Sequence, residues 1–150
     1  MNAETRYLKP AKASNIFNDS VGWLTRRGIS VYGTRMLYVR GRKSGELRSQ
    51  PVNPLPYEGQ RYLVAPRGTT QWVRNIRAAD GQAELRLGRK VEPIRVIELA
   101  DDDKPALLRA YLKKWAFETG VFFDGLTAKS SDEELRAAAP GYPIFRIETR

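Results

Sequence analysis

Short segments that alternate apolar and polar residues, joined by tight turns, restrict the fold of this chain more than any other pattern in it. Ala83–Leu87 alternates in this way, and the turn Gly88–Lys90 leads into Val91–Leu99, which can return beside it. A period of two residues is typical of strands with one buried face, and such turns join antiparallel neighbours. Strands are expected at Met36–Arg40, Arg48–Tyr57, Gln60–Ala65, Ala83–Leu87, Val91–Leu99 and Tyr142–Ile147. The prolines of Arg48–Tyr57 make it an irregular or edge strand, and Glu58-Gly59 is expected to form a hairpin turn into Gln60–Ala65.

Helix signals separate these strands. The acidic run Asp101–Asp103 suits the start of a helix of about fifteen residues, because carboxylates stabilise the positive end of the helix dipole. Ser131 and Glu134 form a capping box for a short helix that ends before Pro140. Two further helices are expected, Ser14–Arg27 and a helix capped by Thr69 or Thr70 that ends near Asp80-Gly81. Helices inserted between hairpin-connected strands indicate an α+β fold around a small antiparallel barrel.

The length of 150 residues and the hydrophobic fraction of 41% predict one globular domain over residues 1–150, with residues 1–13 flexible. The chain shows no signal peptide and no apolar run that could cross a membrane, so we expect a cytoplasmic protein. We interpret the N-terminal helix Ser14–Arg27 as packed on the barrel. The alternative is a basic amphipathic helix that makes peripheral contact with a membrane.

The chain contains no cysteine and no histidine. This excludes disulfides, thiol nucleophiles and zinc sites built from those residues, and it removes the commonest general acid–base group. If the protein is an enzyme, we expect a cofactor to carry the chemistry. The run Asp101–Asp103 is better explained as a helix start than as a metal site, and we predict no metal.

Two basic, glycine-containing loops suggest an anion site. The first lies in Gly41–Asn53, a loop that leads into a strand and carries Arg42, Lys43 and Arg48, and the second is Ala65–Gly68. Glycines let backbone N–H groups approach a ligand closely, and cations beside them suit a phosphate or several carboxylates. The net charge of +9 also favours anionic partners. The alternative is that these cations are only solvated surface charge.

Aromatic residues gather near the end of the helix that follows Asp103. Trp115, Phe122 and Phe123 lie close to Gly120 and Gly125 in the sequence. Core packing is the ordinary interpretation of aromatic residues at this spacing. The alternative is that they form a hydrophobic wall or lid over a substrate.

The ordered set of motifs resembles the deazaflavin-dependent nitroreductase family of actinobacteria. The resemblance covers roughly residues 16–148. It rests on the ordered set of motifs, because no single motif would suffice. These motifs are Gly41-Arg42-Lys43-Ser44-Gly45, Arg48, Gln50-Pro51, Ala65-Pro66-Arg67-Gly68, Trp72-x-x-Asn75, Ser131–Arg136, Ala139-Pro140 and Pro143–Ile147.

The resemblance implies a split β-barrel of the flavin-reductase and FMN-binding type. It also implies coenzyme F-420, an 8-hydroxy-5-deazaflavin with a phosphate and a polyglutamate tail. The positions that match the family's cofactor site are Arg42, Lys43, Ser44, Arg48, Gln50, Pro51, Val52, Asn53, Ala65, Pro66, Arg67, Gly68, Gln71, Trp72 and Asn75. The family's best-known member has tyrosines late in its chain, where this chain has Trp115, Phe122 and Phe123. Those tyrosine roles are therefore not carried over.

The function implied is hydride transfer from the reduced deazaflavin to a small hydrophobic electrophile, such as an enone, quinone, lactone or nitroaromatic. We name no catalytic residue, because solvent or any of Tyr38, Tyr57, Tyr62 and Tyr111 could supply the proton, and nothing in the sequence selects among them. One alternative is FMN or heme-type binding on the same barrel. Another is a basic nucleic-acid-binding barrel, which is disfavoured because no strand alternates cations with aromatics. We expect no nucleic-acid partner, and either a monomer or a homodimer.

Overall fold

The computed structural model describes residues 34–119 and 125–150, with side chains described for residues 34–114 and 125–150. The expected helix Ser14–Arg27, the expected flexible segment 1–13 and residues Phe122 and Phe123 lie outside this range. The described chain forms two compact units. The first unit comprises Leu55–Thr70 and Glu98–Arg146, and the second comprises residues 34–54, Gln71–Ile97 and Ile147–Arg150. The single domain expected for residues 1–150 stays a prediction.

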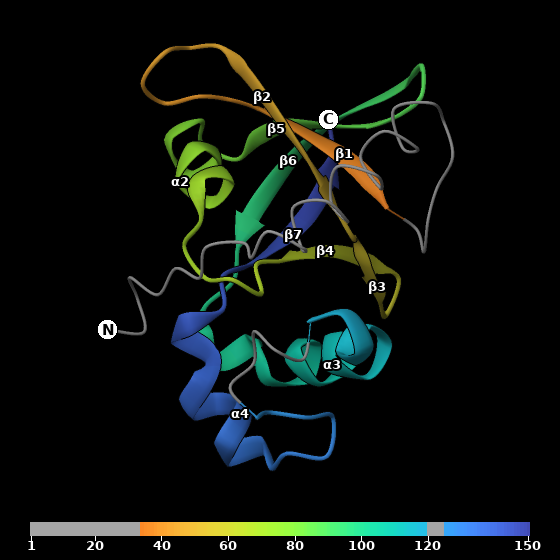
Figure 1. Ribbon diagram of the computed structural model, residues 1–150, viewed down its shortest axis with the longest axis vertical. Helices are drawn as coiled ribbons and strands as arrows, with labels where there is room; N and C mark the ends of the chain where they lie inside the picture. The colour runs from red at the N-terminus through yellow and green to blue at the C-terminus, as the bar shows by residue number, and fades with distance from the viewer. Residues whose placement is uncertain (1–33, 120–124) are drawn as a thin grey trace. The chain divides into compact units, whose positions relative to one another are not determined.

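The second unit contains an antiparallel sheet in the order β2-β1-β5-β6 (Figure 1). Its strands are β1 (Arg35–Arg40), β2 (Leu47–Val52), β5 (Gln82–Leu87) and β6 (Lys90–Glu98), the last residue of which belongs to the first unit. Leu37 pairs with Gln50 of β2 on one side and with Leu85 of β5 on the other. The hairpin expected at Gly88–Lys90 is confirmed, because β5 and β6 pair from Leu87 and Lys90 outward.

Helix α2 (Gln71–Ala78) contacts β1 in the second unit. Val73 and Ile76 of the helix and Leu37 and Leu85 of the sheet are all buried. Neighbouring side chains on a strand point to opposite faces, so Leu37 and Val39 share one face of β1, and Met36 and Tyr38 share the other. The helix α2 therefore packs on an apolar surface of β1.

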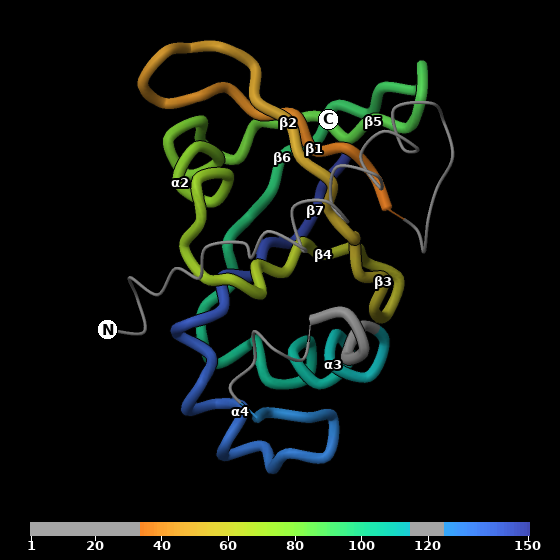
Figure 2. The backbone as a smooth tube through the Cα atoms, viewed as in Figure 1, coloured from red at the N-terminus to blue at the C-terminus, as the bar shows by residue number. Residues whose placement is uncertain are grey.

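The first unit contains the hairpin of β3 (Leu55–Tyr57) and β4 (Gln60–Val64), whose backbone is traced in Figure 2. The turn expected at Glu58-Gly59 is confirmed, because both residues have positive φ, 47° and 78°. This conformation matches the twist of a two-residue hairpin turn. The unit also contains helices α3 (Pro105–Thr119) and α4 (Asp132–Ala138).

The apolar core of the first unit joins these helices to the β3–β4 hairpin. Four residues at helical spacing in α3, Leu107, Leu108, Tyr111 and Leu112, are buried together with residues of the hairpin, α4 and the segment that follows it. The buried members are Leu55, Val64, Leu107, Leu108, Tyr111, Leu112, Leu135, Ala139, Tyr142 and Ile144. The capping box of α4 is also confirmed, since Ser131 Oγ accepts from the Glu134 backbone N–H at 3.1 Å and Glu134 Oε1 accepts from Ser131 N–H at 3.2 Å.

Three expected boundaries are wrong. Arg48–Tyr57 is not one strand, because it is divided into β2 and β3 before Pro54, which has no N–H for a ladder. The expected edge position is confirmed for β2, which stands at the end of the order β2-β1-β5-β6. Asp101–Asp103 forms a separate 3-10 turn, and α3 begins at Pro105. A continuous helix would need a hydrogen bond from the missing Pro105 N–H to the Asp101 carbonyl.

The last strand, β7, spans Ile144–Thr149 instead of Tyr142–Ile147. A 3-10 turn over Ala139–Gly141 follows α4, so the strand begins later in the chain. Within the first unit, the Leu99 N–H donates to the Ile144 carbonyl at 2.9 Å, and within the second unit the Arg150 N–H donates to the Pro93 carbonyl at 3.1 Å.

The cap expected for α2 is wrong at Thr70, because Thr70 Oγ1 is buried without a hydrogen-bond partner. The search of the described helices for a membrane span found none with the necessary length and apolar character.

Candidate functional site

The loop between β1 and β2 is a compact turn held by its own backbone. The Gly41 N–H donates to the Glu46 carbonyl at 2.8 Å, and the Gly45 N–H donates to the Gly41 carbonyl at 2.9 Å. Gly45 adopts φ of 73°, which costs a glycine nothing sterically. Ser44 Oγ accepts a further hydrogen bond from the Glu46 N–H at 3.1 Å. The loop therefore presents its charged side chains from a closed backbone frame.

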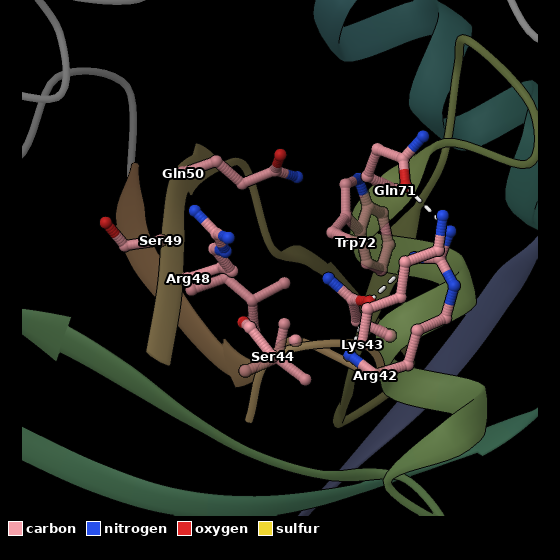
Figure 3. A pocket seen from close by; sticks show the side chains of 12 residues that line it. Arg42, Lys43, Ser44, Arg48, Ser49, Gln50, Gln71 and Trp72 are labelled. Carbon is pink, nitrogen blue, oxygen red and sulfur yellow. Dashed lines mark hydrogen bonds between the residues drawn. The ribbon is translucent and has the colours of Figure 1, made fainter. Parts of the chain in front are cut away.

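A cavity of about 370 Å³ lies in the second unit, bordered by β1, β2, this loop and α2 (Figure 3). Its volume is in the range typical of small-molecule sites. Figure 3 shows Gln50 of β2 pointing toward Trp72 and Gln71 of α2, whereas Ser49 points away. The lining residues are Leu37, Val39, Gly41, Arg42, Lys43, Ser44, Arg48, Ser49, Gln50, Gln71, Trp72 and Asn75.

The cavity has an apolar part and a cationic part. Leu37, Val39 and Trp72 are 0%, 2% and 8% exposed, and they supply the apolar part. Lys43 and Arg48 are exposed on the loop and on β2. A flat, partly apolar ligand with an anionic extension would satisfy both parts.

Arg42 joins the loop to α2. Its backbone N–H and its Nη1 both donate to Asn75 Oδ1, at 3.1 and 2.8 Å, and its Nη2 donates to Gln71 Oε1 at 2.9 Å. Asn75 is 6% exposed. Gln71 and Asn75 are four residues apart and therefore share one face of the helix. The three donors of Arg42 thus meet two acceptors that α2 presents together.

The other two cations of the loop region are held less firmly. Arg48 forms an ion pair with Glu46 at 3.5 Å, but the two side chains are 61% and 71% exposed. Exposed pairs of this kind contribute little to stability, because water screens them. Lys43 has no hydrogen-bond or ion-pair partner among the described residues. Both side chains can therefore engage an added anion at small cost.

Eight of the fifteen residues predicted for the cofactor site line this cavity. They are Arg42, Lys43, Ser44, Arg48, Gln50, Gln71, Trp72 and Asn75. Pro51, Val52 and Asn53 are in the same unit but do not line it, and the Asn53 Oδ1 accepts a hydrogen bond from Thr34 Oγ1 at 2.7 Å.

The remaining predictions concern other parts of the chain. Ala65, Pro66, Arg67 and Gly68 belong to the first unit, and their part in a site stays a prediction. The side chain of Trp115 and residues Phe122 and Phe123 lie outside the described part, so the substrate wall expected there is also untested.

Sequence reasoning missed four lining residues. Leu37 and Val39 belong to an expected strand, where alternation alone identifies them as core residues. Gly41 lies in the recognised loop, and Ser49 follows Arg48 directly. Only the register of β1 with β2 reveals that Leu37 and Val39 stand opposite Gln50 and Arg48.

Of the four tyrosines proposed as proton donors, Tyr38 is on the face of β1 opposite to Leu37 and Val39. The Arg86 guanidinium lies 4.0 Å from the centroid of the Tyr38 ring, and Arg86 Nη2 pairs with Glu84 at 2.6 Å. Tyr38 therefore does not line the cavity. The other three tyrosines belong to the first unit.

Comparison with protein families gives one match that spans most of the chain. The sequence pattern of the F420H(2)-dependent quinone reductase family matches residues 14–119. A comparison with curated proteins found no match.

Solved structures share the fold at low sequence identity. An F420-H2 dependent reductase, FDR-A, is 20% identical, with a TM-score of 0.50 over 77% of this chain and 94% of its own. A structure described as a domain-swapped dimer is 16% identical, with a TM-score of 0.56 over 91% of this chain and 100% of its own. The conserved hypothetical protein Rv2991 of Mycobacterium tuberculosis is 13% identical, with a TM-score of 0.50 over 95% and 82%. These likenesses confirm the expected α+β fold of the split β-barrel class.

Proposed function

Because the chain belongs to the F420H(2)-dependent quinone reductase family, we propose that the cavity beside α2 holds coenzyme F-420 while an acceptor is reduced. Family membership makes the protein an F-420-dependent oxidoreductase, as the resemblance implied, and the FMN alternative is not needed. The observation that carries the assignment of the site is the pair of exposed cations, Lys43 and Arg48, at the edge of a cavity with an apolar lining.

The residues of this cavity suit the chemistry of the coenzyme. Phosphate and carboxylate groups are best recognised by Lys and Arg donors, which Lys43 and Arg48 provide. A heteroaromatic ring favours apolar and aromatic neighbours, which Leu37, Val39 and Trp72 provide. No cluster of three or more His, Cys, Asp or Glu residues suited to a metal ion occurs among the described residues.

When bound, the reduced deazaflavin supplies a hydride equivalent. The chain's own residues bind, orient and exclude water. The side chains of Leu37 and Val39 cannot form hydrogen bonds, so the surface that they offer favours dry, apolar contact. The Arg42 contacts with Asn75 and Gln71 keep the loop backbone beside α2, so that Lys43 stays at the cavity edge.

The acceptor that we propose is a small hydrophobic electrophile of the quinone type. The family is named for this activity, and an apolar lining suits a flat, neutral ring. The test is to follow oxidation of reduced F-420 by the purified protein with a soluble benzoquinone, a nitroaromatic and an enone. Turnover of the nitroaromatic or the enone alone would contradict the quinone assignment.

Equilibrium titration tests the site directly. Coenzyme F-420 is added to the protein, and quenching of the protein fluorescence is followed, with FMN as the control ligand. Lys43→Ala and Arg48→Ala should each weaken binding by about 10-fold to 1000-fold, because each removes a charge-assisted contact. Arg89→Ala is the matched control, since it removes one exposed cation from the same unit outside the cavity lining. Wild-type affinity in both cavity variants would show that the coenzyme binds elsewhere.

We also propose a homodimer. The support is the likeness to a structure described as a domain-swapped dimer, which this chain matches along the whole of that chain. Light scattering coupled to size exclusion would measure the mass in solution. The sequence mass of 17.0 kDa makes the two outcomes easy to separate, and a mass near 17.0 kDa at all concentrations would refute the dimer.

A further inference from the structure

The three cations of the loop region are in unequal states. Arg42 donates three hydrogen bonds to α2, whereas Arg48 has an exposed ion pair with Glu46 and Lys43 has no partner among the described residues. Lys43 and Arg48 can therefore contact an added anion without breaking a buried interaction. Recruiting the whole Arg42 guanidinium would require its contacts with α2 to break.

Recruiting the Arg42 guanidinium would remove the side-chain donor of Asn75 Oδ1 and would leave the Arg42 backbone N–H bonded to it. Asn75 is 6% exposed, and its Oδ1 accepts from both the backbone and the side chain of Arg42. Losing a charge-assisted hydrogen bond at a buried acceptor costs free energy, because water cannot readily replace the lost donor there. Arg42 is therefore committed to the helix.

We propose that Arg42 and Asn75 are positioning residues, which lock the β1–β2 loop to α2 so that Lys43 and Arg48 can bind the anionic part of coenzyme F-420. This inference rests on the proposed function of the cavity. It separates the cationic residues by role: Arg42 acts through the position of the loop, and the other two contact the anion. It also gives Asn75, a neutral residue, an effect on the affinity for an anion.

The charge-preserving substitution Arg42→Lys distinguishes positioning from simple charge. Lysine keeps the positive charge but has no planar fork that could reach Asn75 and Gln71 together. We expect Arg42→Lys to weaken F-420 binding by about tenfold, equivalent to about 1.4 kcal/mol, and Arg42→Ala to be no more than a few-fold worse. Full recovery of wild-type affinity in Arg42→Lys would mean that Arg42 contributes only charge, and would overturn the proposal.

A double-mutant cycle between Arg42 and Asn75 supplies the second readout. Asn75→Ala should weaken F-420 binding by about tenfold on its own and by a smaller factor when Arg42 is already alanine, because the side-chain hydrogen bond is shared and only the bond from the backbone N–H of residue 42 is left to lose. Asn75→Ala should also leave the salt dependence of binding unchanged, since it removes no charge, whereas Lys43→Ala should flatten it. Fully additive losses would show that Asn75 or Arg42 contacts the coenzyme directly.

Thermal unfolding of each variant without coenzyme identifies any that fail to fold. If Asn75→Ala does not fold, the exposed Gln71 replaces it in the cycle, because Gln71 Oε1 accepts from Arg42 Nη2 at the surface. Failure of this inference is distinct from failure of the site. If Lys43→Ala and Arg48→Ala bind F-420 normally, the site is wrong, whereas full recovery in Arg42→Lys refutes only the positioning role.

Discussion

Gly81 is the position where one methyl group should do most damage to the second unit. It follows α2 and adopts φ of 78°. The Gly81 N–H donates to the Ile76 carbonyl at 2.9 Å, and the Asp80 N–H donates to the Arg77 carbonyl at 3.2 Å. These two bonds are those of a Schellman motif, in which Asp80, with φ of 53°, is the left-handed residue that ends the helix and Gly81 follows it. The Gly81 carbonyl also accepts from the Val96 N–H of β6 at 2.8 Å.

A Cβ on Gly81 would lie 2.2 Å from the Val96 carbonyl oxygen and 3.3 Å from the Val96 nitrogen. The clash is with backbone, so β6 must move. The left-handed conformation costs an alanine about 1–2 kcal/mol. Forced movement of a packed strand costs about 1–3 kcal/mol, and weakening the Val96 hydrogen bond costs about 1 kcal/mol. We therefore expect Gly81→Ala to lower the free energy of unfolding by about 3–6 kcal/mol, a large part of the 5–15 kcal/mol typical of a domain.

Gly59→Ala is the matched control. Gly59 has the same φ of 78°, but no atom lies within 4 Å of the Cβ that it would gain. It should lose only the conformational part, about 1–2 kcal/mol. Urea denaturation of both variants, followed by circular dichroism, measures the difference. Equal losses in the two variants would refute the argument that the approach of Val96 to Gly81 is what requires a glycine.

Three further changes have expected outcomes in the same urea assay. Ser131→Ala removes the capping box of α4 and should cost about 1 kcal/mol, whereas Ser131→Thr, which keeps the hydroxyl, should lose much less; equal losses would contradict the cap. Lys104 is 3% exposed, and its Nζ donates to Asp101 at 2.6 Å and to the Ala139 carbonyl at 3.1 Å. Lys104→Met should cost about 0.5–1.5 kcal/mol, because the Ala139 carbonyl loses one of its two donors and keeps the Tyr142 N–H at 3.0 Å, and an unchanged midpoint would show that the contact contributes nothing. Asp80 has φ of 53°, and among the described residues its side chain makes only an exposed ion pair, with Arg95 at 3.5 Å, so Asp80→Gly should stabilise by about 0.5–1 kcal/mol; destabilisation would mean that the ion pair outweighs the strain.

Local patterns predicted the features that depend on neighbours in the chain. The capping box at Ser131 and the turn at Glu58-Gly59 involve residues one to three positions apart, so the sequence there contains the whole interaction. The error at Asp101–Asp103 has the same local origin. The preference of carboxylates for a helix start was given more weight than the missing N–H of Pro105, which separates the turn from α3.

Some features of the candidate site could be predicted from the sequence, and others depend on the tertiary structure. Arg42, Lys43 and Arg48 could be recognised as a basic loop, because their residue types and the nearby glycines suffice. The different roles of these cations could not be recognised, because Arg42 meets Asn75 at a separation of 33 residues. Leu37 and Val39 look like ordinary core residues until the pairing of β1 with β2 places Gln50 and Arg48 opposite them. The sequence alone determines which chemical groups the chain carries. The packing of elements that lie far apart in the sequence determines which of these groups come into contact.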